Sequence, residues 1–349
     1  MKIAVAMSGG VDSSLAAALL QKQGHDIFGV TMRQYDPQLA GYAEGEGIDA
    51  DILDAKAVCE KLKIEHYVVD LITDFREIVE KNFIEEYSNG RTPNPCVLCN
   101  PTIKFGKFLE AAIDLGADKL ATGHYIKTKT IDDVVHIYVP EDEAKDQTYM
   151  IWKLSQTQLK RVIFPLAAYT KQEVRELSAK MDLPVHSKKD SQEICFIKDH
   201  YQDFLEKYMQ IKPGKIVLAN GQEIGEHRGL PLYTIGQRKG LGTPWHKPLF
   251  VLRLDVKKNR VIVTDNPDDL LRKTFDLAEV NWISGKPLED IENLKVKVRY
   301  NSSAVDVEKL ENYDHYSKVE LKNPTRAITP GQSAVFYKNG ELIGGGKIK

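Results

Sequence analysis

The stretch SGGVDSS, Ser8 to Ser14, decides how the N-terminal part of this 349-residue chain is interpreted. It follows an apolar run, Ile3 to Met7, that is typical of a buried strand, and it precedes a helix-forming run rich in Ala and Leu. Adjacent glycines allow positive φ angles and a close approach of the backbone to a ligand. The start of the next helix offers unpaired N–H groups and the positive end of its dipole. The stretch therefore predicts a strand, turn and helix that bind an anion, usually phosphate.

The alternative is an ordinary capped turn between a strand and a helix, but the whole seven-residue string is much rarer than such turns. It is not a Walker P-loop, because G-x-x-x-x-G-K-[ST] occurs nowhere in the chain. It resembles the PP-loop, SGGxDSS, of the ATP pyrophosphatase superfamily, whose members cleave ATP to AMP and pyrophosphate and use the AMP to activate a carbonyl oxygen. The resemblance implies that Gly9 to Ser13 cradle pyrophosphate, with Asp12 near Mg²⁺.

Apolar strands and amphipathic helices alternate through the first half of the chain. In the expected helix 51–63, Ile52, Ala55 and Cys59 recur at helical spacing, so Cys59 is expected in the core. Buried strands separated by amphipathic helices imply an α/β fold with a doubly wound parallel sheet, in which ligands bind at the carboxyl ends of the strands. The other expected strands are 27–32, 66–71 and 119–122, and the other expected helices are 74–87 and 103–115.

The pattern changes after Phe196. Residues from about 200 to 271 combine a short helix with Gly-rich turns. Short alternating runs from about Phe275 onward, such as KVKVRY and QSAVFY, predict an antiparallel barrel or sandwich. The chain is therefore expected to hold two or three domains.

Composition indicates a cytoplasmic globular protein. Charged residues make up 28% of the chain and hydrophobic residues 42%. There is no run of eighteen apolar residues, and the N-terminus enters a strand at once, so neither a membrane span nor a secretory signal is expected. Four cysteines are too few for a disulfide scaffold in a chain this long and favour functional thiols.

Charge is distributed unevenly along the chain. The net charge is −2, but residues 211–260 hold 10 Lys and Arg against 3 Asp and Glu. A basic middle segment fits a large anionic partner. A solvated basic face is the alternative.

The loop-like stretch GRTPNPCVLCN, Gly90 to Asn100, carries Cys96 and Cys99 in a C-x-x-C spacing, and Cys195 follows a polar turn. Two prolines and an asparagine predict that the stretch is a loop. A four-cysteine zinc site would need a second pair, which is missing, and the prolines argue against a thioredoxin-like redox pair. Catalysis by thiols in loops is the interpretation that the spacing favours.

Seven motifs in order resemble those of the tRNA-specific 2-thiouridylases: TPNPCVLCN, ATGHY, KDQTYM, SQEICFI, GLPLYTIGQRKGLG, VRYNSSA and TPGQSAVFY. With SGGVDSS they cover essentially the whole chain. The resemblance implies a PP-loop catalytic domain (1–199), a small central tRNA-binding domain (200–271) and a C-terminal antiparallel β-barrel (272–349). It also implies the replacement of the C2 oxygen of the wobble uridine, position 34, by sulfur.

The resemblance implies how the thiols act. ATP adenylates the uracil C2 oxygen, and the sulfur comes from a persulfide on Cys195 that an upstream sulfur carrier or cysteine desulfurase supplies. Cys99 either releases the terminal sulfur or forms a transient Cys99–Cys195 disulfide, although 96 positions separate the two residues. The implied partner is the tRNA anticodon stem-loop, with the wobble base splayed out, and the protein is expected to be a monomer.

The resemblance also assigns binding residues one position at a time. For four of the positions implied to contact tRNA there are non-binding alternatives. Lys145 and Arg299 can be plain surface charges, Tyr300 a barrel residue and His124 a hydrogen-bonded histidine at the end of a strand. The residues implied to bind ATP are Ala6, Met7, Ser8, Gly9, Gly10, Val11, Asp12, Ser13, Met32 and Gly123. Those implied to contact the target base are Asn94, Pro95 and Cys96, and those implied to contact tRNA are His124, Lys145, Asp146, Gln147, Arg299, Tyr300 and Gln332.

Cys96 departs from the family pattern, in which NPD is usual where this chain has NPC. An Asp there would be a natural general acid or base, whereas an ordinary thiol has a pKa of about 8.5, so that role is in doubt. Cys96, Cys99 and Cys195 can instead hold a [4Fe–4S] cluster with one open iron position. A passive Cys96 beside an unaided persulfide relay is the alternative.

Rival interpretations come from the same superfamily and from outside it. Argininosuccinate and lysidine synthetases need no active-site thiols, and tRNA 2-thiocytidine synthetases resemble a pattern with two C-x-x-C pairs, which this chain lacks. A non-catalytic nucleotide-binding module, such as an electron-transfer flavoprotein subunit, would not need the intact SGGVDSS together with loop thiols.

Overall fold

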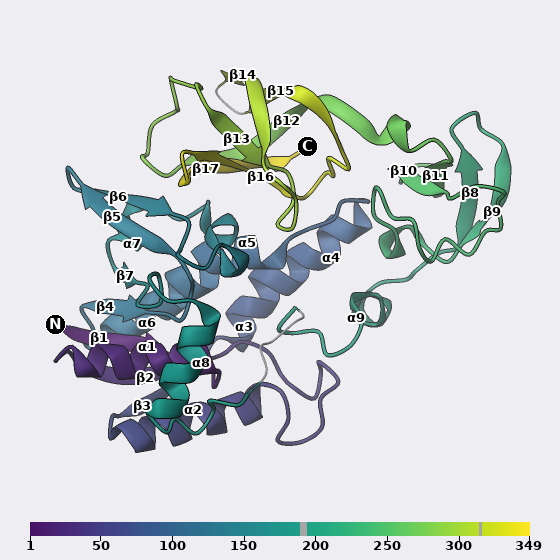
Figure 1. The fold of residues 1–349 in the computed structure, drawn as a ribbon. Helices are drawn as coiled ribbons and strands as arrows, with labels where there is room; N and C mark the ends of the chain where they lie inside the picture. The colour runs from purple at the N-terminus through teal and green to yellow at the C-terminus, as the bar shows by residue number, and fades with distance from the viewer. Residues whose placement is uncertain (189–193, 314–315) are drawn as a thin grey trace.

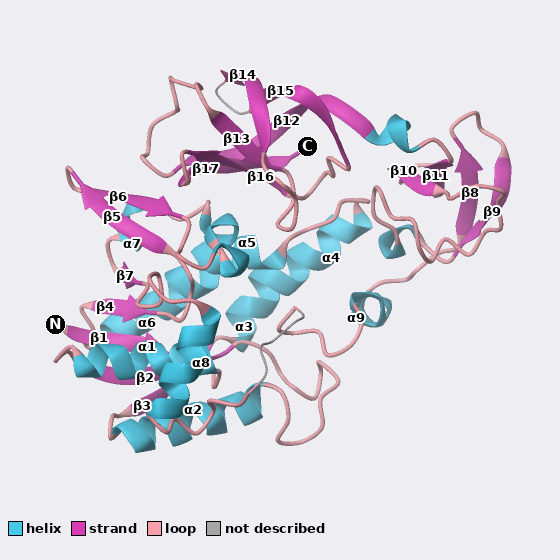
Figure 2. Ribbon diagram, in the orientation of Figure 1, coloured by secondary structure: helices cyan, strands magenta, loops and turns pink. Residues whose placement is uncertain are grey.

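The computed structural model describes residues 1–188, 194–313 and 316–349. Along the chain, an α/β part comes first, a small β-rich part lies at one side, and a β-barrel lies above the α/β part (Figure 1). Helices are concentrated in the first part and strands in the other two (Figure 2). No helix in the described ranges is long and apolar enough to cross a membrane.

The α/β part is built on a five-stranded parallel sheet with the order β3-β2-β1-β4-β7. In β1, Ile3 and Val5 pack with residues of the first two helices, whereas Ala4 packs on the opposite face with Phe105 and Phe108. Because side chains alternate along a strand, both faces are covered, which confirms the predicted doubly wound sheet. The strands are β1 Lys2–Ala6, β2 Asp26–Arg33, β3 His66–Asp70, β4 Lys119–Ala121 and β7 Val162–Ile163.

The helices follow the expected alternation, with two departures from regular α-helix. A π-helical turn at Arg76–Glu80 (η1) joins α3 to α4, and a second π-helical segment, Asn100–Lys107 (η2), follows α5 and is kinked at Gly106, whose backbone angles are not helical. The α-helices are α1 Val11–Lys22, α2 Ile48–Leu62, α3 Ile72–Phe75, α4 Lys81–Ser88, α5 Pro95–Cys99, α6 Phe108–Asp114, α7 Gln156–Leu159, α8 Lys171–Lys180 and α9 Tyr201–Tyr208. Short 3-10 helices are η3 Glu143–Lys145, η4 Thr148–Ile151, η5 Leu230–Leu232 and η6 Pro267–Leu270.

The small β-rich part has its own sheet and core. Its sheet has the strand order β10-β11-β8-β9. Ile216, Val251 and Val261 are fully buried in one cluster with Leu and Tyr side chains of the Gly-rich turns. The strands are β8 Gly214–Leu218, β9 Glu223–His227, β10 Phe250–Asp255 and β11 Arg260–Thr264.

The C-terminal part is a closed antiparallel barrel, as predicted. Its six strands follow the order β12-β15-β14-β13-β16-β17, and pairing of β12 with β17 closes the ring. Alternate residues such as Val296, Val319 and Phe336 fill the interior. The strands are β12 Leu271–Trp282, β13 Leu294–Lys297, β14 Val305–Asn312, β15 Ser317–Arg326, β16 Ser333–Lys338 and β17 Glu341–Ile348.

Two contacts fasten the barrel to the α/β part. The hairpin β5 (Lys127–Ile131) and β6 (Val134–Tyr138) leaves the α/β part and pairs with β17, which extends the barrel sheet. Glu86 of α4, with a side chain only 5% exposed, accepts ion pairs from Arg91 at 2.7 Å and from Lys347 of β17 at 3.0 Å. Removing either of these two connections would loosen the same interface.

Candidate functional site: a nucleotide turn beside three thiols

The SGGVDSS turn lies at the carboxyl end of β1 and leads directly into α1. Its hydroxyl groups hold the turn itself: Ser14 Oγ donates to Gly10 O at 2.8 Å, and Ser13 Oγ donates to the same carbonyl at 3.1 Å. The Ser8 N–H in turn donates to Ser13 Oγ at 3.2 Å. Gly10 is the N-cap of α1, and no side chain among the described residues caps the helix. The first N–H groups of α1 therefore remain available to an anion.

Two glycines shape the turn for steric reasons. Gly9 has φ +66°, and a Cβ there would lie 2.4 Å from the Asp51 carbonyl oxygen. At Gly123, which follows β4, a Cβ would lie 2.7 Å from Ser13 N and 2.8 Å from Asp12 C. Both positions thus need glycine because the backbone of another segment packs against them.

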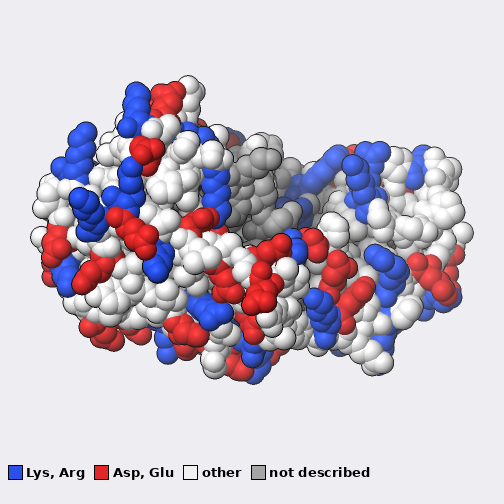
Figure 3. All heavy atoms as spheres, turned by 90° about the horizontal axis from the view of Figure 1, so that it is seen from below, with Lys and Arg blue, Asp and Glu red and all other residues white. Residues whose placement is uncertain are grey.

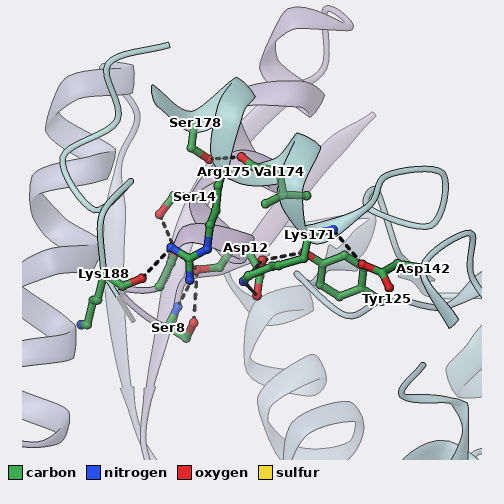
Figure 4. A network of polar contacts seen from close by, with 12 residues as sticks. Ser8, Asp12, Ser14, Tyr125, Asp142, Lys171, Val174, Arg175, Ser178 and Lys188 are labelled. Atoms are coloured by element: carbon green, nitrogen blue, oxygen red, sulfur yellow. Dashed lines mark hydrogen bonds and ion pairs between the residues drawn. The ribbon is translucent and has the colours of Figure 1, made fainter. Parts of the chain in front are cut away.

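Asp12 is the centre of a charged network at the turn (Figure 4). Lys171 Nζ of α8 lies 2.7 and 2.8 Å from the two Asp12 carboxylate oxygens, and Tyr125 OH donates to Asp12 Oδ1 at 2.8 Å. A carboxylate oxygen pair at a phosphate site suits Mg²⁺, which prefers hard oxygen ligands. The Lys171 ammonium now neutralises the Asp12 carboxylate. A magnesium ion could neutralise the same carboxylate, so Asp12 is compatible with the predicted role as a magnesium ligand.

The stretch that carries Cys96 and Cys99 is not the predicted loop, because Pro95–Cys99 forms helix α5. Asn94 Oδ1 accepts the N–H groups of Cys96 at 3.1 Å and Val97 at 3.4 Å, and Pro95 occupies the first helical turn. An Asn cap followed by Pro is a helix-start signal that the sequence interpretation overlooked. Both thiols are therefore carried by a helical turn and not by a loop.

The π-helical segment after α5 orients Cys99. Pro101 has no N–H group, so the regular α-helical hydrogen-bond pattern cannot continue through this point. The backbone N–H of Lys104 acts on Cys99 and lowers the pKa of its thiol, against the effect of burial. Asn100 Nδ2 donates to Met150 O at 2.8 Å, which fixes the segment against the rest of the α/β part.

The fold brings Cys96, Cys99 and Cys195 within electrostatic reach of one another, although 96 positions separate the last two. Cys96 and Cys195 are exposed and Cys99 is partly buried. Although part of the Cys195 surface is exposed, the protein atoms packed around the two sulfurs desolvate them. This desolvation raises the pKa of Cys99 to about 11 and the pKa of Cys195 to about 12, with the neighbouring thiols adding to the rise. Burial also raises the pKa of Cys96. Cys59, by contrast, is buried in the core as predicted.

The predicted [4Fe–4S] cluster has no support from this arrangement. Among the residues that the structure describes, which include all three cysteines, no three His, Cys, Asp or Glu side chains are grouped as ligands for a metal ion. The three thiols interact electrostatically but are not arranged as a ligand set.

Lys104 and His124 connect the thiols to the nucleotide turn. Lys104 Nζ lies 3.3 Å from His124 Nε2, and Thr122 Oγ1 lies 2.8 Å from His124 Nδ1. Burial, reinforced by the positive charge of Lys104, lowers the pKa of His124 well below its ordinary value, so the ring is neutral. The Lys104 charge also lowers the pKa values of all three thiols, against the effect of burial. Gly123, the residue before His124, packs on α1. The Lys104–His124 pair therefore lies between the nucleotide turn and the thiols.

His124 apart, most of the residues expected to contact tRNA make internal contacts near the junction of the three parts. Gln332 Nε2 donates to Thr92 O at 2.8 Å, just before the helix that bears the thiols. Arg299 Nη2 donates to Ile235 O of the small β-rich part at 2.8 Å. The others are buried Asp146, whose carbonyl accepts from Tyr300 OH at 3.0 Å, Gln147, whose side chain accepts from Tyr125 N at 3.0 Å, and Lys145 of η3.

Three cations at the site were missed in the sequence: Lys104, Lys171 and Arg175. The last two had a readable signal. They are four residues apart in a helix that begins with a Thr170–Glu173 capping box, which puts both on one helical face. Nothing local marks Lys104, whose role depends on contacts made by the folded chain.

Comparisons with known proteins agree over the full length. The family models of the tRNA methyl transferase HUP domain, the tRNA methyl transferase PRC-barrel domain and the aminomethyltransferase beta-barrel domain match residues 1–199, 202–265 and 272–348. A tRNA-specific 2-thiouridylase MnmA of Pelobacter propionicus is 45% identical, with 100% of this chain and 97% of the relative covered. Proteins of the same name from Trichlorobacter lovleyi (44%; 100% and 97% covered) and, as MnmA 1, from Clostridium tetani (43%; 100% and 96%) are similarly related.

Proposed function

Because the chain belongs to the tRNA-specific 2-thiouridylase family, we propose that it catalyses the ATP-dependent 2-thiolation of the wobble uridine, position 34, of tRNA. Family membership makes it a tRNA-uridine 2-sulfurtransferase that uses ATP. The proposal adds the position of the base, the adenylated intermediate, the persulfide and the residues that perform each step.

One observation supports the proposal: a chain of contacts links the nucleotide turn to the thiols. Gly123 packs on the first residues of α1, and the next residue, His124, contacts Lys104, whose charge acts on Cys96, Cys99 and Cys195. A base held between these groups would have its C2 oxygen near the α-phosphate of ATP and its C2 carbon near a sulfur. A nucleotide-binding module without catalysis has no use for this arrangement.

In the first step, the uracil C2 oxygen attacks the α-phosphorus of ATP and pyrophosphate leaves. The turn and the free N–H groups at the start of α1 bind the phosphates. Mg²⁺, held by Asp12, would neutralise phosphate charge when bound. The residues proposed to bind ATP are Ala6, Met7, Ser8, Gly9, Gly10, Val11, Asp12, Ser13, Met32 and Gly123.

In the second step, sulfur replaces the adenylated oxygen. Cys195 carries the persulfide, whose terminal sulfur attacks C2, and AMP leaves with the former C2 oxygen. The Cys99 thiolate attacks the Cys195 sulfur, so the terminal sulfur is released with its electron pair and a Cys99–Cys195 disulfide remains. An external reductant then restores both thiols.

The raised pKa values of Cys99 and Cys195 bear on this step, because a protonated thiol is a poor nucleophile. Desolvation keeps the resting thiols protonated at neutral pH, which protects them from stray oxidation. Lys104 is positioned to favour the thiolate once tRNA excludes water from the site and strengthens the interaction between the two charges.

The tRNA would lie against both β-rich parts. Lys and Arg side chains, mixed with acidic ones, lie on the lobe that contains β8 to β11, including its edge beside the hollow between the lobes (Figure 3). We propose that this part, residues 200–271, binds the tRNA backbone, in line with its excess of basic residues, and that affinity falls steeply with salt. Asn94, Pro95 and Cys96 would contact the flipped base, and the residues at the three-part junction would contact the surrounding tRNA.

The test is a reconstituted reaction with purified protein, ATP, a persulfide donor and tRNA bearing uridine 34. We expect 2-thiouridine at position 34, by nucleoside mass spectrometry, with equal amounts of AMP and pyrophosphate released. The matched control is the same tRNA with cytidine 34, which should support neither product. ATP cleavage without tRNA, release of ADP, or methylated instead of thiolated uridine would contradict the proposal.

A further inference from the structure

The nucleotide turn lacks a cation of its own. In a Walker P-loop, a lysine inside the motif reaches the β- and γ-phosphates. The stretch Ser8 to Ser14 contains no Lys or Arg and adds the negative charge of Asp12. Backbone N–H groups carry only partial charges, so a bound triphosphate needs positive side chains from elsewhere in the fold.

Helix α8 is placed to supply them. Its Val174 is fully buried against Leu15 and Ala16 of α1, which packs the two helices together. The capping box of Thr170 and Glu173 fixes where α8 begins. Lys171 and Arg175, one helical turn apart, consequently face the nucleotide turn, as the close-up shows (Figure 4).

Lys171 already binds an anionic partner at this site. Its side chain is 12% exposed, and Nζ lies within 2.8 Å of both Asp12 carboxylate oxygens. Its backbone N–H donates to Asp142 Oδ2 at 2.8 Å, so the base of the side chain is fixed while its end can turn. Two oxygens of a phosphate would offer Nζ the same geometry as the two oxygens of Asp12.

Arg175 lies on the other side of the turn. Its Nη1 donates to Lys188 O at 3.0 Å, and its guanidinium group points towards Ser8 and Ser14. Lys188 Nζ in turn pairs with Asp51 at 2.8 Å, the residue whose carbonyl lies against Gly9. The guanidinium is thus held beside the turn through two neighbouring segments, and a planar guanidinium suits bidentate binding of phosphate.

We propose that Lys171 and Arg175 of α8 bind the β- and γ-phosphates of ATP, and that Lys171 leaves Asp12 for the nucleotide when Mg²⁺ reaches that carboxylate. The inference rests on the proposed ATP site and adds two binding residues to it. The exchange conserves charge pairing, because Asp12 trades an ammonium for a metal ion while Lys171 trades a carboxylate for a phosphate. The ion pair keeps both groups satisfied until the nucleotide arrives.

The decisive experiment measures the affinity of the full-length protein for inorganic pyrophosphate without Mg²⁺, by titration calorimetry. Lys171→Met and Arg175→Met should each weaken binding about tenfold or more, because each removes a charge-assisted contact. Asp12→Asn should strengthen it, because Lys171 is released to the phosphate. With Mg²⁺ and ATP, Asp12→Asn should instead lose the metal-dependent gain that wild type shows.

The controls separate binding from folding. Lys180→Met, at an exposed position of the same helix, should leave the affinity unchanged. Thermal unfolding and tRNA binding show which variants are folded, and Arg175→Lys should recover part of the affinity if charge matters. If Asp12→Asn and Lys171→Met change Mg²⁺-free pyrophosphate affinity in the same direction, the pair is merely structural and the inference is wrong. If wild type binds neither ATP nor pyrophosphate, the proposed function itself fails.

Discussion

At the nucleotide turn, Ser13 and Ser14 bind the Gly10 carbonyl through contacts that span at most four residues, and the backbone at Asp51 and Gly123 packs against this locally formed turn. The thiols depend on packing between distant segments, since Cys195 reaches Cys99 across 96 positions of sequence. A substitution in the turn should therefore act on phosphate binding and, where other backbone packs closely against the turn as at Gly9, on stability. A substitution near the thiols should act on their relative position and reactivity. Four experiments test this difference between the two regions.

The largest effect is expected from the thiols themselves. Cys195→Ser and Cys99→Ser should each lower 2-thiouridine formation by at least about 10³-fold, because each removes a nucleophile that a hydroxyl does not replace. Binding of tRNA should persist in both variants. The measurement is the yield of 2-thiouridine in single-turnover reactions.

Cys59→Ser is the matched control, since Cys59 is buried in the core and lies on α2. It should lose stability while its activity per folded molecule stays near that of wild type. Full activity in Cys195→Ser, or an equal loss in Cys59→Ser, would refute the assignment of the nucleophiles.

The next effect concerns the backbone of the turn. Gly9→Ala should destabilise the fold by several kcal/mol, because it combines φ +66° with a Cβ placed 2.4 Å from Asp51 O. Gly24→Ala is the comparison: its φ is +82°, but nothing lies within 4 Å of the added Cβ. It should cost about 1 kcal/mol. Equal midpoints in urea unfolding would mean that contact with Asp51 does not shape the turn.

A third experiment tests the thiols by pH. Folding raises the pKa of Cys99 to about 11 and that of Cys195 to about 12, so both stay protonated where an unfolded thiol, with a pKa near 8.5, ionises. At pH 9 alkylation by iodoacetamide should be about a hundredfold slower at Cys99, and approaching a thousandfold slower at Cys195, than in urea-unfolded protein. The rate should keep rising to pH 11, and the folded state should lose stability over the same range. A plateau near pH 9 in folded protein would contradict the desolvated site.

The smallest effect is expected from the helix cap beside the thiols. Asn94→Ala removes the acceptor for the N–H groups of Cys96 and Val97 and should cost about 1 kcal/mol. Asn266→Ala is matched to it, because Asn266 also caps a short helix that starts with Pro and accepts from Asp268 N at 3.3 Å. Both should lower stability slightly, but only Asn94→Ala should change alkylation rates at Cys96 and Cys99. Unchanged rates in both would mean that the cap does not position the thiols.

The difference between local and long-range contacts also explains which features could be predicted from the sequence. Strands, most helices, the turn and the core position of Cys59 follow from patterns within short windows, and the structure confirms them. The prolines at 93 and 95 predict a loop, but the Asn94 cap and Pro95 in the first turn start a helix at Pro95–Cys99 instead. The closure of the barrel and the Lys104–His124 contact depend on pairings between distant residues, which no local pattern encodes.

The hairpin that leaves the α/β part has a consequence for how the protein is made. Strand β6 pairs with β17, so that Tyr138 lies opposite Glu341 and Ile137 opposite Leu342. A ribosome must therefore translate about two hundred further residues before β6 receives its second neighbour. Until then the hairpin presents an open strand edge, which favours pairing with other nascent chains. Synthesis that stops before residue 341 would leave this edge exposed, and the shortened product should be prone to aggregation and degradation.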